Sequence, residues 1–238
     1  MKNQYFGDIN DYKKYGLLRI LSNDGEIKIA VCWMLTNADR RSDGKLINYL
    51  NKPDKWKVFD PPLFDSLKSC FAKPENRNVL WAETTNIITS AVFYTNLVSD
   101  NSLERQQYFN QFLRIAEGCD LVFFDPDTGL EVKSKPYGRK YSSKYLYWSE
   151  LLSTFKAGYS VLFYQHFRRK RGEKRSEFIN NLAKDLSLRS GASEVISFRT
   201  SNVVFMLISQ RQHLDYFQQR GEAVNKTWAS EIQVAHHP

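Results

Sequence analysis

Runs of apolar residues alternate along the chain with stretches whose apolar positions recur at helical spacing. Continuous apolar runs predict buried parallel strands over residues 27–35, 78–82, 121–124 and 160–164. Helical spacing between these runs predicts helices over residues 11–21, 63–71, 102–117, 145–155 and 176–186, the first with Asn10 or Asp11 as its N-cap. The alternation predicts an α/β fold: a Rossmann-like, mostly parallel sheet with helices on both faces.

The C-terminal part of the chain departs from this alternation. Residues 194–199 and 203–209 indicate two strands joined by a turn at 200–202, a β-hairpin whose last strand runs antiparallel at or near a sheet edge. Residues 92–97 indicate a further strand or a buried segment, and the tail from Gln210 starts helical and then loses its pattern. No repeat or linker interrupts the chain, so residues 1–238 are expected to form one Rossmann-like α/β domain.

Charge adds a class of partner to this picture. The chain carries 34 Lys and Arg against 26 Asp and Glu, a formal net charge of +8 at pH 7, and we expect nucleic acid as its partner. The positive charge is concentrated in residues 133–144, where it is interleaved with Tyr137, Tyr141 and Tyr145, and in residues 168–175. We expect these stretches to flank the mouth of the site. The alternative is that both are solvated loops.

Cysteine usage and hydropathy indicate the compartment. Cys32, Cys70 and Cys119 are odd in number and lack CxxC spacing, which indicates a reducing environment without a disulfide framework or structural zinc. The first residues are polar, and no apolar run approaches the ~18 residues of a membrane span. We therefore expect a cytoplasmic protein with no signal peptide and no membrane partner.

The candidate chemistry centres on the residues that follow the strand predicted at 121–124. The run Asp125-Pro126-Asp127-Thr128-Gly129 ends this strand in a turn that carries two carboxylates. Ligands of open α/β sheets bind beyond the carboxyl ends of strands, so Asp125 and Asp127 are candidates for catalysis. Alternatively, both aspartates only cap the strand and the turn.

Polar residues also follow the other predicted strands. They are Thr36 and Asp39 after the first strand, Glu83 after the second, and His166, Arg168 and Arg169 after the fourth. If these strands are parallel neighbours, all of these residues share one rim of the sheet. His166 has an alternative interpretation as a hydrogen-bonded structural residue.

Asp125-Pro126-Asp127 resembles the Asp-Pro-Pro-aromatic motif of amino-methyltransferases, although the second proline and the aromatic residue are absent. The order of elements is similar to that of the class I methyltransferases that act on adenine in large-subunit ribosomal RNA. The polar and aromatic segment 5–15 resembles their leading helix, and residues 44–50 resemble their inserted segment. A departure is the turn after the first strand, which has no glycine before Gly44.

This resemblance implies a methyltransferase-like protein that uses S-adenosylmethionine and acts on a base amine of nucleic acid. It implies Asp125 as acceptor for the amine, Pro126 as the residue that fixes its geometry, and Asp127 and His166 beside them. Cofactor contacts would come from Thr36, Asp39 and Glu83. Substrate contacts would come from Lys13, Tyr137, Tyr164, Arg168 and Arg169.

Two other functions remain open from the residues alone. The first is a nuclease or phosphohydrolase that binds Mg²⁺ through Asp8, Asp11, Glu83, Asp125 and Asp127, with Glu131 as a further ligand and Lys13, His166 and Arg168 on the phosphate. The second is a nucleic-acid-binding module without catalytic activity, which the missing glycine turn favours.

Overall fold

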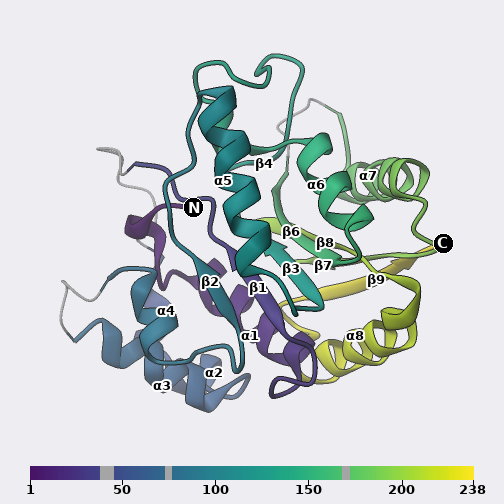
Figure 1. Cartoon of the computed structure of the whole chain (residues 1–238). Helices are drawn as coiled ribbons and strands as arrows, with labels where there is room; N and C mark the ends of the chain where they lie inside the picture. The colour runs from purple at the N-terminus through teal and green to yellow at the C-terminus, as the bar shows by residue number, and fades with distance from the viewer. Residues whose placement is uncertain (38–45, 73–76, 168–171) are drawn as a thin grey trace.

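A computed structural model describes residues 1–37, 46–72, 77–167 and 172–238, and its centre is a seven-stranded sheet (Figure 1). The strand order is β2 (Val92–Tyr94), β1 (Ile29–Cys32), β3 (Leu121–Phe124), β6 (Ser160–His166), β8 (Val203–Ile208), β7 (Val195–Arg199) and β9 (Gln233–His237). The first four strands are parallel, and β8, β7 and β9 continue the sheet as antiparallel neighbours. The chain therefore has the predicted α/β, Rossmann-like fold with a mostly parallel sheet.

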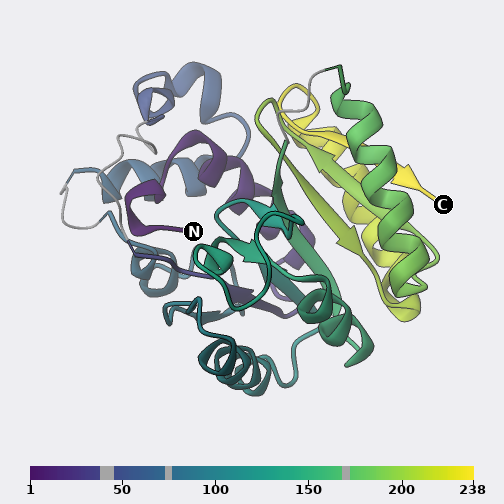
Figure 2. The same cartoon turned by 90° about the horizontal axis from the view of Figure 1, so that it is seen from above.

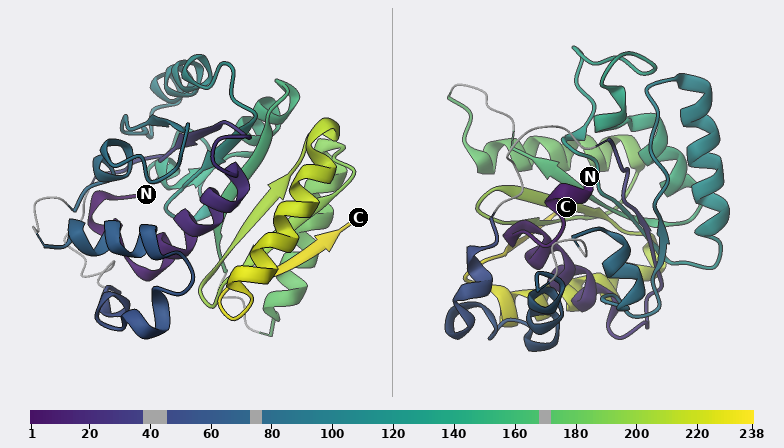
Figure 3. Two further views of the ribbon diagram at one scale, coloured as in Figure 1. Left: turned by 90° about the horizontal axis from the view of Figure 1, so that it is seen from below. Right: turned by 90° about the vertical axis from the view of Figure 1, so that its left-hand side faces the viewer.

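Helices cover both faces of this sheet, as the side view of Figure 3 shows. One layer holds α1 (Ile9–Ser22), α3 (Pro61–Cys70) and α8 (Leu214–Trp228), with the short α2 (Pro53–Trp56) and α4 (Leu80–Thr84) beside them. The other layer holds α5 (Ser102–Ile115), α6 (Trp148–Lys156) and α7 (Arg175–Ser190). Side chains of β3 alternate between the layers, with Phe123 in the first and Phe124 in the second, because successive residues of a strand face opposite ways.

The strands predicted over 121–124 and 160–164 are confirmed, and the strand predicted over 27–35 is present but shorter, at Ile29–Cys32, whereas the strand predicted over 78–82 is wrong. Residues 80–84 form α4, and β2 takes the place beside β1. The four apolar residues 79–82 do not distinguish a strand from one buried turn of helix. Here the Asn78 side chain accepts a hydrogen bond from the Leu80 amide at 3.0 Å and turns the backbone into the helix.

The hairpin at the C-terminal end is confirmed, but its expected position is not. Strand β8 lies inside the sheet between β6 and β7, and the edge is formed by β9. The sequence QVAHH of β9 has no apolar run, because an edge strand exposes part of its surface. The tail that loses its pattern therefore contains both a helix, α8, and a strand.

Two caps explain how the first helical layer begins. The Asp8 carboxylate accepts hydrogen bonds from the Asn10 and Asp11 amides at 2.8 and 3.0 Å, so Asp8 is the N-cap of α1, in place of Asn10 or Asp11. Asp60 likewise caps α3 ahead of two prolines. No helix of the described ranges is both long and apolar enough to cross a membrane.

Candidate active site

The carboxyl ends of β1, β3 and β6 meet at one rim of the sheet, and several predicted site residues gather there. Asp125 follows β3 directly, and its amide donates to the Cys32 carbonyl at the end of β1. The His166 amide at the end of β6 donates to the Thr128 carbonyl. In the view of Figure 2 the N-terminus lies near the middle of the molecule, beside the loops that leave these strands.

A buried ammonium group holds Asp125. Lys14 Nζ lies 2.7 Å from Asp125 Oδ2 and 2.7 Å from Asp11 Oδ1, and all three side chains are almost fully buried. Burial by itself would lower the pKa of Lys14, but the two carboxylates outweigh it and raise that pKa, so the lysine stays charged. Asp125 is therefore fixed in orientation by an ion pair from α1.

Three oxygen atoms next to Asp125 form what we call the ammonium site. They are the main-chain oxygens of Met34 and Asp125 and Asp127 Oδ1, and they surround the amine of Met1 at 3.2, 2.9 and 2.9 Å. Burial alone would raise the pKa of Asp127, but the amine, Lys2 and the Thr36 hydroxyl at 2.9 Å hold it below its usual range. The predicted residues Thr36 and Asp127 are thus brought together around a positive charge.

The turn after β1 adopts a backbone conformation that usually requires glycine, although it contains no glycine. Met34 adopts a left-handed φ of 45°, a region that most side chains avoid. Its side chain is buried in the second helical layer, and the Trp33 side chain is buried in the first. The main chain of Met34 is therefore free to present its carbonyl to the ammonium site.

His166 and Tyr164 lie on the β6 side of the rim. Tyr164 Oη and His166 Nε2 are 3.2 Å apart, and the two rings meet edge to face at 5.0 Å. Surrounding protein lowers the pKa of His166 despite the attraction of Asp125 and Asp127, which favours a neutral imidazole. His166 is exposed, so it can accept or donate a proton at the surface of the site.

Other predicted residues are not brought to this group. Lys13 Nζ pairs with Glu231 at 2.6 Å and lies over the Trp56 ring, so the neighbouring residue Lys14 is the one that reaches Asp125. Glu83 stands on α4, where burial raises its pKa. Glu131 caps α6 by accepting from the Trp148 amide at 2.8 Å. Asp39, Arg168 and Arg169 lie outside the described residues.

The proposed metal ligands do not form a metal centre. Lys14 occupies the space between Asp11 and Asp125, and Asp8 is used as a helix cap. Across the described ranges, no three His, Cys, Asp or Glu side chains are placed to hold a metal ion together. The Lys14 ammonium group already pairs with the Asp11 and Asp125 carboxylates, which a metal ion would need as ligands.

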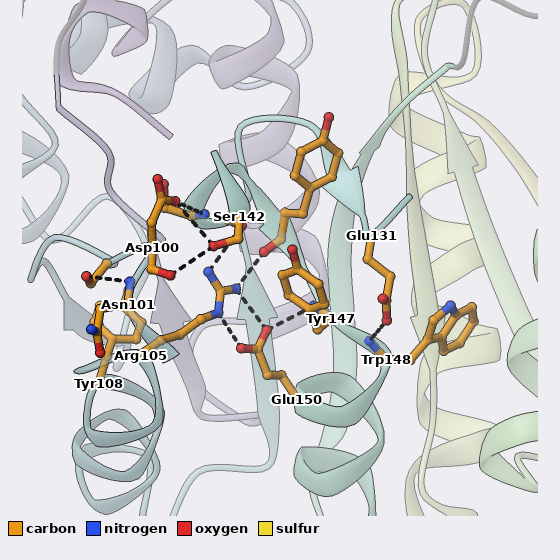
Figure 4. A network of polar contacts seen from close by, with 12 residues as sticks. Asp100, Asn101, Arg105, Tyr108, Glu131, Ser142, Tyr147, Trp148 and Glu150 are labelled. Carbon is orange, nitrogen blue, oxygen red and sulfur yellow. Dashed lines mark hydrogen bonds and ion pairs between the residues drawn. The ribbon is translucent and has the colours of Figure 1, made fainter. Parts of the chain in front are cut away.

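A second buried network anchors the basic stretch 133–144 beside the rim (Figure 4). Arg105 is fully buried on α5 and forms a two-pronged ion pair with Glu150, at 2.5 and 2.9 Å. The same guanidinium donates to the carbonyls of Ser142 and Tyr145 at 3.2 and 2.6 Å. The Lys144 carbonyl in turn accepts from the Thr128 amide at 3.0 Å, so this stretch is bonded to the turn that carries Asp125 and Asp127.

Comparison with known proteins adds little to this geometry. No protein-family model matches the chain, and no curated protein matches it. One solved structure similar to the chain is the crystal structure of protein LPL1258 from Legionella pneumophila, of the family model DUF519. The two are 9% identical, the match covers 98% of this chain and 96% of that chain, and the TM-score is 0.45. The function therefore has to be argued from the residues of the site.

Three features of the site were not predicted from the sequence. They are the ion pair of Lys14, the left-handed backbone at Met34, and the positions of three lysine side chains over the Tyr141 ring, those of Lys135, Lys140 and Lys144. The ion pair between Lys14 and Asp11 could have been predicted, because Lys14 lies one turn after Asp11 on the same face of α1. The other two depend on left-handed backbone conformations, at Met34 and Tyr141, that their residue types do not predict.

Proposed function

We propose that the protein transfers a methyl group from S-adenosylmethionine to an amino group of a nucleic-acid base. The observation that carries the proposal is the ammonium site between β1 and β3. Two main-chain oxygens and one carboxylate are the acceptors that an α-ammonium group needs, and a methionine amine, that of Met1, already fits among them. S-adenosylmethionine contains the same methionine amine, and it supplies a methyl group when bound.

The residues that would hold this cofactor are Met34 and Asp125 through their carbonyls and Asp127 through its carboxylate, with Thr36 orienting Asp127. Binding would require the amine of Met1 to leave the same acceptors. The left-handed turn at Met34 supports the fit, because it aims the carbonyl at the site as a glycine turn would.

Asp125 supports an amine as the acceptor of the methyl group. Its carboxylate has one oxygen on Lys14, and Pro126 restricts the backbone that follows it. A carboxylate held in this way accepts a hydrogen bond from an amino group and orients it without taking up a metal. Asp125 is 2% exposed, so a base reaches it only after residues at the rim have moved.

Calorimetry with S-adenosylmethionine and a labelled methyl-transfer assay on nucleic acid test the proposal. Asp125→Asn keeps one acceptor oxygen and should retain turnover within about tenfold, whereas Asp125→Val should lose about 10²–10³-fold. Circular dichroism and nucleic-acid binding serve as fold controls, because both changes disturb a buried ion pair. Absence of cofactor binding, or cleavage of nucleic acid that depends on Mg²⁺, would overturn the proposal in favour of the binding-module or hydrolase alternative.

A further inference from the structure

Three lysine side chains converge on one exposed tyrosine ring in the stretch 133–144. The Nζ atoms of Lys135, Lys140 and Lys144 lie 5.0, 5.1 and 5.7 Å from the centre of the Tyr141 ring. The ring is 45% exposed. We call Tyr141 and these three lysines the Tyr141 cluster. No ion pair with a carboxylate is found for any of the three lysines within the described part of the chain.

The backbone holds this cluster in place. Tyr141 has a left-handed φ of 71°, which costs free energy for a residue with a side chain. The Asp100 carboxylate stabilises that backbone by accepting from the amides of Tyr141 and Ser143, each at 2.7 Å. These hydrogen bonds keep the pKa of Asp100 below its usual range although burial opposes them. The Asp100 carboxylate is thus engaged by backbone amides.

Three positive charges, each within 5.7 Å of the centre of one ring, repel one another unless an anion lies near them. A tyrosine ring offsets part of this repulsion, since cations are attracted to its face. The remaining positive charge, next to a half-exposed aromatic surface, is the combination that binds single strands: ammonium groups on phosphates and a ring against which a base can stack. The cluster is bonded to the turn bearing Asp125 through Lys144 and Thr128.

We propose that the Tyr141 cluster binds the backbone of a single-stranded nucleic acid next to the nucleotide whose base enters the site. This inference rests on the proposed function for the target base, and it adds the substrate class. An unpaired strand is favoured over a duplex because Asp125 is buried below the rim, and a base within a duplex would first have to be flipped out of its stack at a cost in free energy.

Fluorescence anisotropy with labelled single-stranded RNA and DNA, without cofactor, tests the cluster. The variant Lys135→Gln/Lys140→Gln/Lys144→Gln should bind at least about tenfold more weakly, with a salt slope smaller by about 2, as expected for three lost phosphate contacts on a single strand. The matched control changes three exposed helical lysines, Lys156, Lys184 and Lys226, to Gln and should bind like the unchanged protein.

Replacement of the ring separates stacking from charge. Tyr141→Asn tolerates the left-handed backbone and should weaken binding roughly fivefold to hundredfold, whereas Tyr141→Phe should not. Equal binding by the triple-lysine variant and its control, or equal affinity for single strands and duplexes, overturns the proposal. The binding experiment contains no cofactor, so its result is independent of the methyl-transfer assay. Weaker binding by the triple-lysine variant, together with no methyl transfer by the unchanged protein, would support the Tyr141 cluster and reject the proposed function. Unchanged binding by that variant, together with methyl transfer by the unchanged protein, would support the proposed function and reject the cluster.

Discussion

Asp8 is the residue whose ionisation should couple the start of α1 to pH. Burial, assisted by the neighbouring Asp11, raises its pKa from 3.8 to about 7. Between these values the folded protein keeps a proton that the unfolded chain releases, so the free energy of unfolding falls as pH rises from about 4 to about 7. The stabilisation that comes from the raised pKa of Asp8 is fully present below pH 3.8 and is lost above about pH 7.

Asp8→Asn tests this coupling, because asparagine caps a helix as well as aspartate does but carries no charge. The variant should melt at the same temperature as the unchanged protein near about pH 4 and at a higher temperature near about pH 8. Thermal melts across this range are the measurement, with Asp54→Asn, an exposed acid of α2, as the control. A difference between the Asp8 variant and the unchanged protein that does not depend on pH would contradict the assignment.

At the scale of elements, the Arg105–Glu150 ion pair joins α5 to α6 and to the stretch that bears the Tyr141 cluster. Arg105→Met leaves the Glu150 carboxylate buried without its partner, which should lower the free energy of unfolding by about 3–5 kcal/mol. Adding Glu150→Leu removes the stranded charge and should recover part of this loss. Urea unfolding of the two single variants and the double variant measures the coupling. A double variant no more stable than Arg105→Met would show that the carboxylate is not the cause.

At the scale of the whole molecule, the packing of α1 against α8 joins the beginning and the end of the chain. Gly16 of α1 faces the Trp228 ring of α8, and a methyl group added to Gly16 would overlap that ring. Gly→Ala inside an exposed helix stabilises it by up to ~1 kcal/mol. Gly16→Ala should instead destabilise the protein by about 1–3 kcal/mol through overpacking.

Gly221→Ala on α8 is the matched control, since its added methyl group would lie 3.4 Å from Val234 Cγ1, an ordinary contact. This variant should be neutral or slightly more stable. Denaturant unfolding of both variants decides between the expectations. Equal stability of the two would mean that α1 and α8 separate readily, and that the N- and C-terminal elements are not held together at this point.

The sequence by itself determined the features that depend on neighbours along the chain. The buried strand 121–124 and the turn after it were evident from continuous apolarity followed by turn-forming residues. The structure places the strand as predicted, and the turn is one residue shorter than predicted because Gly129 begins the short strand β4 (Gly129–Leu130). The same reasoning failed for residues 78–82, because a short apolar run is compatible with helix and strand. It also failed for β9, whose polar sequence pairs with β7 only because that edge is available.

Only the tertiary structure decided which charges meet. Lys13 and Lys14 are adjacent and identical in type, yet α1 turns one toward Glu231 and the other toward Asp125. The lysines around Tyr141 belong to one short stretch, 133–144, and the left-handed backbone of Tyr141 within that stretch is held by hydrogen bonds to Asp100, which comes from a different segment. Ion pairs and aromatic contacts depend on distances of a few ångströms between segments far apart in sequence. Residue types and local spacing do not determine those distances, so only the tertiary structure shows which residues form the site.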